Sequence, residues 1–313
     1  MKLAFILDPL EHLKAYKDSS VAMMREARGR GHEVFAILRP SLAWRGKLVQ
    51  ATASPLELRD DHHDWFVAGP DFDAPLDAFD AVLMRQDPPF DIEYIAATWL
   101  LERAAASGVR VFNHPRAVRD HSEKLSILEF PQFIAPTLVA REAESLQAFI
   151  DDQQDAVVKP IDGMGGSEVF RVRRDDPNRN VIVETLTHHG ARTVMAQRYL
   201  PEIARGDKRI LLIGGVPVPY CLARIPKPGE SRGNLAVGGT GVAQPLSARD
   251  REIAEALAPI LAARGLLLVG LDVIGDCLTE INVTSPTCFV EIASQTGFSV
   301  AGMFLDALER ECV

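Results

Sequence analysis

The first 115 residues alternate short apolar runs with segments of helical spacing, and this alternation constrains the fold more than any other feature. Segments with apolar runs that predict strands begin at residues 2, 32, 80 and 109, and helical spacing covers Ser19 to Gly29 and Glu93 to Ala106. Strands that alternate with helices form parallel sheets, because each crossover needs a connection long enough to hold a helix. The sequence therefore predicts a doubly wound parallel α/β sheet at the N-terminus.

Polar residues cluster where these predicted strands end and the first predicted helix begins. In parallel sheets, ligands bind at the carboxyl ends of the strands. We expect the following residues to lie along that common edge: Asp8, Asp18, Ser19, Ser20, Arg85 and Asp87. Helix capping is the alternative role, and for Ser19 and Ser20 taken alone it is the better explanation.

A chain of 313 residues is too long for one hydrophobic core, so two or three packed units are expected. A second unit begins near Ser122 with a predicted helix over residues 122–130. A hairpin is predicted around Gly214 and Gly215, and helices over 248–264 and 299–309 flank two further strands.

Charge and apolar patterning exclude several classes of protein. The chain has 34 Lys and Arg against 43 Asp and Glu, a net charge of -9, which disfavours nucleic acid as a partner. No apolar run approaches the roughly 18 residues that cross a bilayer, and the apolar run Leu3 to Leu7 is too short for a signal peptide. The four cysteines form no C-x-x-C pair. A cytoplasmic protein with free thiols and no membrane contact is expected.

A lysine before a glycine-rich turn offers a phosphate site. No Walker A or G-x-G-x-x-G motif occurs, but VVKPIDGMGGSEVFRV places Lys159 at the end of an apolar strand, followed by Gly163, Gly165 and Gly166. A buried, unpaired lysine is costly, and glycines let backbone amides approach a ligand closely. Together they suit a polyphosphate, although this segment alone fits a flexible hairpin with a surface lysine equally well.

Oxygen donors on two neighbouring strands suggest a metal site. Glu280 and Asn282 stand two apart in LTEINVTSPT and hence on one strand face, and Asp272 follows the apolar run LLLVGL. Mg²⁺ binds through a few protein oxygens together with substrate phosphates. A lone acidic residue at a strand end is usually only solvated, so the prediction depends on all three together.

Arginines of the predicted hairpin suggest an acidic substrate. Asp207 and Arg209 open one strand on a shared face, and Arg224 closes the other. Arginine forks bind carboxylates in a bidentate manner, although these residues could instead pair with one another. No Ser-His-Asp or Cys-His pattern stands out, which disfavours covalent catalysis by the protein.

The stretch from Pro226 to Gly241 contains five glycines and two prolines with few apolar residues. This composition is typical of a mobile lid rather than of a core element. Arg232 and Asn234 lie within it and could contact a bound intermediate once the lid closes.

Ten sequence blocks, in order along the whole chain, carry a resemblance to one family. They are DSSVAMM, VLMRQDPPFD, RDHSEKL, VVKPIDGMGGSEVFRV, MAQRYLP, GDKRILLI, PVPYCLARIP, ESRGNLAVGGTG, VGLDVIGD and LTEINVTSPTC. With these blocks, the chain resembles the bacterial glutathione synthetases of the ATP-grasp superfamily. The resemblance implies an ATP-grasp fold with an N-terminal parallel α/β domain over 1–121 and two α+β lobes enclosing ATP. The lobes would span 122–200 and 201–313, with a catalytic loop over 225–244, and the protein would form a homo-oligomer, a dimer or tetramer.

The resemblance also implies roles for individual residues. For ATP it implies Lys124, Lys159, Gly163, Gly165, Gly166, Ser167, Gln197, Tyr199, Leu200 and Asp207. For Mg²⁺, with Mn²⁺ as an alternative, it implies Asp272, Glu280 and Asn282. For catalysis it implies Arg209, Arg224 and Arg232. For the peptide substrate it implies Asp18, Ser20, Arg85, Arg209, Arg224, Ser285 and Thr287.

The implied reaction joins γ-glutamylcysteine to glycine through an acyl phosphate, with release of ADP and phosphate. The nearest alternative is another ATP-grasp carboxylate-amine ligase, such as a D-alanine ligase or a glutamate-adding enzyme. A non-catalytic ATP-binding module on the same fold should lack the metal ligands or the substrate arginines, and this chain has both. A third alternative is an acidic interaction protein with a buried ion-pair network. Such a protein would show no ATP-dependent thermal shift.

Overall fold

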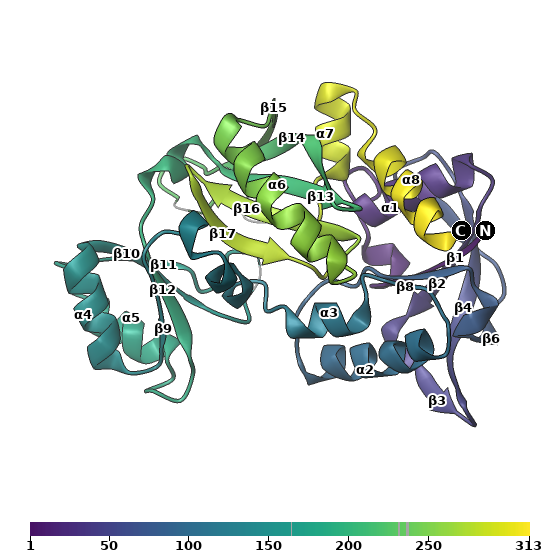
Figure 1. Cartoon of the computed structure of the whole chain (residues 1–313), viewed down its shortest axis with the longest axis horizontal. Helices are drawn as coiled ribbons and strands as arrows, with labels where there is room; N and C mark the ends of the chain where they lie inside the picture. The colour runs from purple at the N-terminus through teal and green to yellow at the C-terminus, as the bar shows by residue number, and fades with distance from the viewer. Residues whose placement is uncertain (164, 231, 236–237) are drawn as a thin grey trace.

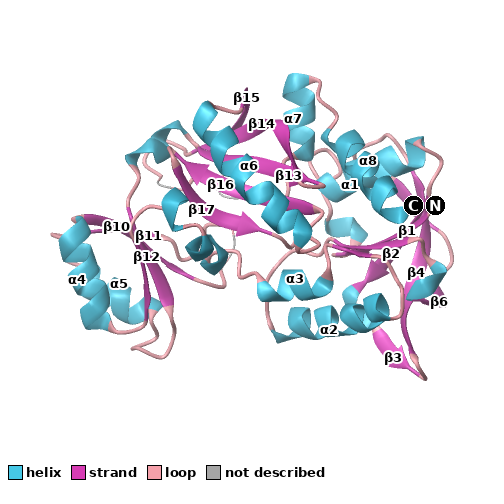
Figure 2. Ribbon diagram, viewed as in Figure 1, coloured by secondary structure: helices cyan, strands magenta, loops and turns pink. Residues whose placement is uncertain are grey.

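The computed structural model describes residues 1–163, 165–230, 232–235 and 238–313. Three sheets lie along the long axis of the molecule, with the sheet of residues 207–282 between the N-terminal sheet and the sheet of residues 137–198 (Figure 1). Helices cover their outer faces, as Figure 2 shows. The division at residues 121 and 200 remains a prediction, but each sheet takes its strands from one of the three ranges.

The first sheet contains the predicted parallel core. Its parallel strands, in the order β2-β1-β7-β8, are β1 (Lys2–Leu7), β2 (Glu33–Leu38), β7 (Ala81–Met84) and β8 (Val111–Phe112). Leu3 and Phe5 share a core with helix α1 (Ser19–Gly29), whereas Ala4 and Ile6 share another with α2 (Ile92–Ala106). Alternate residues of β1 therefore face helices on opposite sides, which is the doubly wound arrangement. Short helix α3 (Pro115–Asp120) leads out of this domain.

An antiparallel extension of this sheet was not predicted. Its strands are β3 (Ala43–Arg45), β4 (Leu48–Leu58), β5 (Phe66–Ala68) and β6 (Phe72–Pro75). In β4 the buried residues Val49, Ala51 and Ala53 alternate with partly exposed polar ones. The alternation is readable in the sequence, but two of its three buried residues are alanines, which give a weak hydrophobic signal.

The second sheet is antiparallel, in the order β11-β10-β12-β9. Its strands are β9 (Thr137–Ala140), β10 (Asp155–Pro160), β11 (Phe170–Arg173) and β12 (Val194–Arg198). Helices α4 (Ala143–Gln153) and α5 (Arg179–Leu186) cover one face, where Ala156 and Val158 of β10 are buried. Val157 and Lys159 therefore point to the opposite face. The helix predicted over 122–130 is instead a short 3-10 turn, Leu125–Glu129, followed by a second over Pro131–Phe133.

The third sheet is also antiparallel, in the order β15-β14-β13-β16-β17. Its strands are β13 (Asp207–Ile213), β14 (Val216–Ile225), β15 (Thr240–Pro245), β16 (Leu268–Ile274) and β17 (Cys277–Asn282). Ile210 and Leu212 of β13 pack with α6 (Ala248–Ala263), whereas Leu211 and Ile213 pack with α8 (Val300–Cys312). The predicted hairpin is present, with Gly214 and Gly215 at positive φ in its turn.

The predicted loop over 225–244 is too long. Ile225 belongs to β14, and residues 240–244 belong to β15, which pairs with β14 in register Ile225↔Thr240. The connecting segment is therefore 226–239, of which residues 231 and 236–237 lie outside the described residues. The glycines misled the prediction, because Gly241 sits within a paired strand against Leu222.

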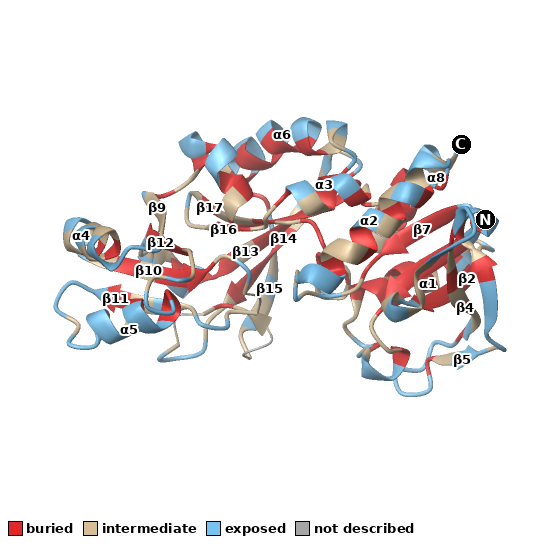
Figure 3. Cartoon of the chain, turned by 90° about the horizontal axis from the view of Figure 1, so that it is seen from below, coloured by how far each residue is buried: buried red, intermediate tan, exposed pale blue. Residues whose placement is uncertain are grey.

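The C-terminal helices return to the N-terminal domain. Arg30, just after α1, donates to Gly302 O and pairs with Asp306 and Glu309 of α8. Asn113, just after β8, bonds Leu268 N and O and Val283 O of the third sheet. Figure 3 shows the buried strands beneath helices whose outer faces are exposed. Among the described residues, no helix is long and apolar enough to cross a membrane.

Candidate active site

Two pockets meet between the three sheets. The first pocket lies between the open face of the second sheet and the third sheet. The second pocket lies between the third sheet and the N-terminal domain. Gly165 and Asn234 line both. The first pocket contains all the residues predicted for ATP: Lys124, Lys159, Gly163, Gly165, Gly166, Ser167, Gln197, Tyr199, Leu200 and Asp207. Residue 164 of the predicted glycine turn lies outside the described residues.

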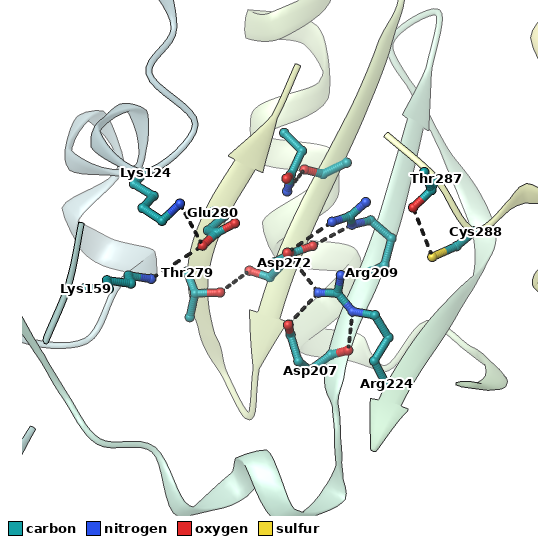
Figure 4. Close-up of polar contacts among 12 residues, drawn as sticks. Lys124, Lys159, Asp207, Arg209, Arg224, Asp272, Thr279, Glu280, Thr287 and Cys288 are labelled. Carbon is teal, nitrogen blue, oxygen red and sulfur yellow. Dashed lines mark hydrogen bonds and ion pairs between the residues drawn. The ribbon is translucent and has the colours of Figure 1, made fainter. Parts of the chain in front are cut away.

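Two buried lysines face a single carboxylate in the first pocket. Lys124 Nζ and Lys159 Nζ lie 3.5 and 3.7 Å from Glu280 Oε1, as Figure 4 shows. Lys124 also donates to Gly163 O at 2.5 Å. Burial lowers the pKa of Lys159, and Glu280 opposes that shift. One carboxylate cannot neutralise two ammonium groups, so the site has a local positive excess suited to phosphate oxygens.

The paired strands β10 and β12 form one wall of a slot in the first pocket. Val157 and Gln197 are register partners on its wall, followed by Tyr199 and Leu200. The guanidinium of Arg171 stacks 3.6 Å from the centre of the Tyr199 ring. Sequence reasoning missed Val157, although its position two residues before Lys159 places it on the same strand face. A flat, partly apolar slot of this kind suits a planar base.

Four charged side chains form a buried network where the pockets meet. Asp272 accepts from Arg209 Nε at 2.6 Å and lies 2.8 Å from a terminal nitrogen of Arg224, which also pairs with Asp207 at 2.5 Å (Figure 4). Burial would raise the pKa of Asp272, but the two arginines outweigh it and lower that pKa. Asp207 has mainly Arg224 beside it, and burial raises its pKa to about 7. The sequence left open that these charged residues pair with one another, and the structure shows that they do. Arg209 and Arg224 still line the second pocket, where a substrate carboxylate can reach them.

The predicted metal ligands come together across strands β16 and β17. Asp272 is the register partner of Glu280, and both line the first pocket, while Asn282 lines the second. Asn282 Nδ2 donates to Gly270 O at 3.1 Å, leaving Oδ1 as its ligand atom. No group of three or more His, Cys, Asp or Glu in the described chain could hold a metal ion. A site here therefore needs the amide of Asn282 and oxygens from a ligand, a donor set that fits Mg²⁺.

The segment 226–239 contacts the glycine turn. Arg232 donates to Gly166 O at 3.1 Å and pairs with Glu230 at 2.7 Å. A Cβ on Gly166 would approach Asn234 Oδ1 to 2.7 Å, so this close approach requires glycine. Arg232, Gly233 and Asn234 thereby line the first pocket.

The predicted peptide-binding residues divide into two groups. Asp18, Ser285 and Thr287 line the second pocket, and Ser285 donates to Asp87 at 2.5 Å. Ser20 and Arg85 line neither of these two pockets. Arg85 is buried and donates to Ser20 Oγ and Pro286 O, so it supports the loop that carries Ser285 and Thr287 from beneath.

Sequence reasoning missed several side chains of the second pocket. These are His12, Lys14, Lys17, Glu123 and Glu291. Glu123 accepts from Val283 N and Thr284 N at 2.9 and 3.1 Å, which ties the loop before Lys124 to the end of β17. No strand or helix periodicity marks these residues, because they reach the pocket from separate loops and from the first turn of a helix.

Two family models match the chain. Residues 1–119 match the family described as prokaryotic glutathione synthetase, N-terminal domain. Residues 123–297 match prokaryotic glutathione synthetase, ATP-grasp domain.

Relatives and solved structures extend the match over the full chain. Glutathione synthetase of Ralstonia nicotianae is 61% identical over 99% of this chain and 96% of its own length. That of Nitrosomonas europaea is 59% identical over 99% of this chain and 98% of its own length. D-Cycloserine synthetase DcsG has a similar fold, with a TM-score of 0.68 at 17% identity over 100% of both chains. ATP-grasp ligase PsnB with a minimal precursor has a TM-score of 0.66 at 18% identity over 99% of both chains. The chain belongs to the prokaryotic glutathione synthetases, ATP-dependent ligases of the ATP-grasp fold.

Proposed function

We propose that this chain joins γ-glutamylcysteine to glycine by activating the cysteinyl carboxylate as an acyl phosphate. The observation that carries the proposal is the meeting of the two pockets at Gly165, Asn234 and the arginine-aspartate network. A nucleotide in the first pocket and a peptide carboxylate in the second would come together at this junction.

In the first step, the carboxylate oxygen attacks the γ-phosphorus of ATP, and ADP leaves. Lys124 and Lys159 would offset charge on the phosphates, and the glycine turn around Gly166 would donate backbone N–H groups to them. The slot of Val157, Gln197 and Tyr199 would hold the adenine ring. These contacts hold the γ-phosphoryl group in line with the attacking oxygen, which supplies most of the rate enhancement in phosphoryl transfer.

In the second step, the unprotonated glycine amine attacks the acyl carbon, phosphate leaves with the bonding electron pair, and the departing phosphate takes up the proton that the nitrogen loses. Arg209 and Arg224 would hold the carboxylate in place before transfer and stabilise the developing oxyanion afterwards. A planar guanidinium suits both tasks because it presents parallel donors to two oxygens. No nucleophile from the protein takes part.

Asp272, Glu280 and Asn282 would hold Mg²⁺, or Mn²⁺, against the phosphate oxygens. When bound, the metal supplies positive charge that polarises the γ-phosphoryl group. Asp272 suits this role because its arginine neighbours keep it ionised despite burial. Glu280 lies 3.5 and 3.7 Å from the two lysines that would contact the phosphates.

The segment 226–239 would keep water out. Acyl phosphates hydrolyse readily, so an open site would waste ATP without forming product. The contact of Arg232 with Gly166 O closes the junction between this segment and the glycine turn.

The test is ADP release with ATP, Mg²⁺, γ-glutamylcysteine and glycine, compared with reactions that omit one component each. We expect rapid ADP release only when both substrates are present, together with glutathione detected by mass. D-Alanine and glutamate serve as alternative acceptors. Faster turnover with either of these, or with a different carboxylate donor, would assign the chain to another ligation.

A further inference from the structure

Glu123 lies where the chain passes from the N-terminal domain to the second sheet, directly before Lys124. Its side chain lines the second pocket, whereas Lys124 lines the first. None of the steps proposed above uses Glu123. Its contacts nevertheless join groups that serve the two pockets.

Four hydrogen bonds fix Glu123 to the end of β17 and to the loop that follows this strand. The backbone O of Glu123 accepts from Ile281 N at 2.8 Å. Its side-chain Oε1 accepts from Val283 N, Thr284 N and Thr284 Oγ1 at 2.9, 3.1 and 2.9 Å. The stretch from Ile281 to Thr284 therefore has little freedom to shift relative to Glu123.

This stretch carries groups that serve both proposed substrates. Asn282, a proposed metal ligand, lies within it, and Ser285 of the second pocket follows it directly. Glu280 comes just before it, with Oε1 3.5 Å from Lys124 Nζ. Glu123 therefore sets the place of a proposed phosphate-binding lysine relative to a proposed metal ligand and to a loop of the second pocket.

Two other side chains hold the same loop, and both come from the N-terminal domain. Arg85 donates to Pro286 O at 2.9 Å, and Asn113 donates to Val283 O at 2.8 Å. Neither adjoins a residue of the first pocket in the chain. Of these three side chains, Glu123 is thus the one that links the loop to the nucleotide side.

We propose that Glu123 is a positioning residue, which aligns the γ-phosphate beside Lys124 with the peptide carboxylate in the second pocket. Transfer between two bound substrates depends steeply on alignment, and a displacement of about 1 Å can cost about a hundredfold in rate. Position rather than charge matters here, because all three side-chain bonds meet Oε1 and none to Oε2 is found among the described residues. The inference rests on the proposed ligation through an acyl phosphate.

The test compares two conservative variants that separate reach from charge. Glu123→Gln removes the charge but keeps an oxygen in the place of Oε1, so kcat should stay within about threefold of the parent. Glu123→Asp keeps the charge but is one methylene shorter and no longer reaches all three donors, so kcat should fall at least about thirtyfold. In both variants, the KM values for ATP and γ-glutamylcysteine should stay within about threefold.

Thr284→Val supplies a milder variant, which decides the matter if Glu123→Asp does not fold. Valine resembles threonine in shape but cannot donate to Oε1, so kcat should fall about fivefold, as for loss of one hydrogen bond. The dissociation constant of ADP, measured by calorimetry, should stay within about threefold. Circular dichroism of each variant shows whether it has folded.

Glu129→Asp and Glu129→Gln are the matched controls. Glu129 ends the short 3-10 turn that begins after Lys124, but it pairs with Arg264 at 2.6 Å in a half-exposed position. Both controls should keep the parent kcat. Asn113→Ala controls for stability, because it also removes buried hydrogen bonds to the loop. Urea unfolding should show that it is less stable than the parent, with kcat within about threefold.

Three outcomes would overturn the inference. Parent kcat in Glu123→Asp, or in Thr284→Val if the first does not fold, would make these hydrogen bonds structural only. A larger loss of kcat in Glu123→Gln than in Glu123→Asp would mean that charge rather than reach matters. A change confined to the KM of one substrate would make Glu123 a binding group for that substrate. If the parent enzyme makes no product from γ-glutamylcysteine and glycine, the proposed function itself fails, and the inference fails with it.

Discussion

Asp207 and Asp272 share one arginine, yet their environments make them chemically different. Asp272 has two guanidinium groups beside it and is held ionised. Asp207 Oδ1 is buried without a hydrogen-bond partner among the described residues, and its pKa is raised mainly by burial. An aspartate binds a metal ion in its ionised form, whereas a carboxylate with a vacant oxygen can accept a hydrogen bond from a ligand hydroxyl group. The difference supports the proposal that Asp272 binds the metal and that Asp207 contacts the ribose or phosphate region of ATP.

Arg224→Lys should weaken use of the peptide far more than use of ATP. Lysine keeps the positive charge but loses the planar fork that reaches Asp207, Asp272 and a substrate carboxylate together. We expect kcat/KM for γ-glutamylcysteine to fall about tenfold to a hundredfold, with the KM for ATP within about threefold. Steady-state kinetics measures both. Arg251→Lys, on the exposed face of α6, is the control, and equal losses for both substrates would contradict the assignment.

Glu280→Gln should abolish most ligase activity while the fold is kept. Glutamine has the same shape, but it removes the charge that faces Lys124 and Lys159 and a predicted metal ligand. We expect kcat at least about a hundredfold lower at saturating Mg²⁺, with an unchanged circular dichroism spectrum. Glu255→Gln on α6 is the control. Parent turnover in Glu280→Gln would exclude Glu280 from the metal site.

At the scale of elements, strands with long apolar runs were predicted well and weakly patterned ones were not. Strand β1 and helix α1 follow the sequence closely, because a buried apolar run and an Asp18 cap mark their limits. Helix α5 and strands β3 to β6 were missed. They are short or half-exposed, and tertiary pairing rather than local preference stabilises them.

The candidate site shows the same division. Residues on strands, such as Lys159 and Asp272, were predictable because alternation fixes which way they face. Glu291 and Lys17 were not, since contact between α1 and α7 (Phe289–Thr296) brings them together from opposite ends of the chain. Arg85 was predicted to line the pocket but lies beneath its floor. Strand alternation predicts which way a side chain points, but it does not predict how deeply that side chain is buried.

Asn113→Ala should destabilise the junction between the first and third sheets. The Asn113 amide donates to Leu268 O and Val283 O at 2.7 and 2.8 Å and accepts from Leu268 N at 2.9 Å. Alanine leaves these buried backbone groups unpaired, which should lower the free energy of unfolding by about 3 kcal/mol. Urea unfolding followed by fluorescence measures the change. Asn180→Ala, at an exposed position on α5, should have little effect, and equal stability in the two variants would show that the junction does not depend on Asn113.

At the scale of the whole molecule, a cluster of ion pairs joins helix α8 near the C-terminus to the residues that follow α1. Glu309 on α8 contacts His32 and Arg30 at 2.8 and 3.0 Å, and Arg30 also pairs with Asp306. The hydrogen bond to His32, followed by Arg30, lowers the pKa of Glu309 despite partial burial. The third sheet thus packs on the N-terminal domain through α8, which helps to hold the second pocket between them.

The lowered pKa of Glu309 gives a pH dependence of known sign. A depressed carboxyl pKa contributes stability above the unfolded value, about 4.3, and that contribution disappears as the pH falls through the lower folded value. Glu309→Gln should therefore melt below the parent at pH 7 and approach it below about pH 4. Thermal melts across this range measure the difference. Glu311→Gln at the end of α8 is the control, and a constant difference at every pH would mean that packing, not charge, is responsible.

The segment 226–239 should act as a lid that couples ATP use to peptide formation. Arg232 holds it to Gly166 O, and its glycines leave many open conformations available when ligands are absent. Limited proteolysis within the segment should be fast for the enzyme alone and slow with ATP, Mg²⁺ and γ-glutamylcysteine. Ile225 and Thr240 are register partners, so a linker of about four glycines can replace the segment without disturbing the flanking strands. This variant should fold and bind ATP but release more ADP per glutathione formed, because water reaches the acyl phosphate. If its ratio of ADP to glutathione equals that of the parent and ligands do not slow cleavage, the segment has no role in excluding water.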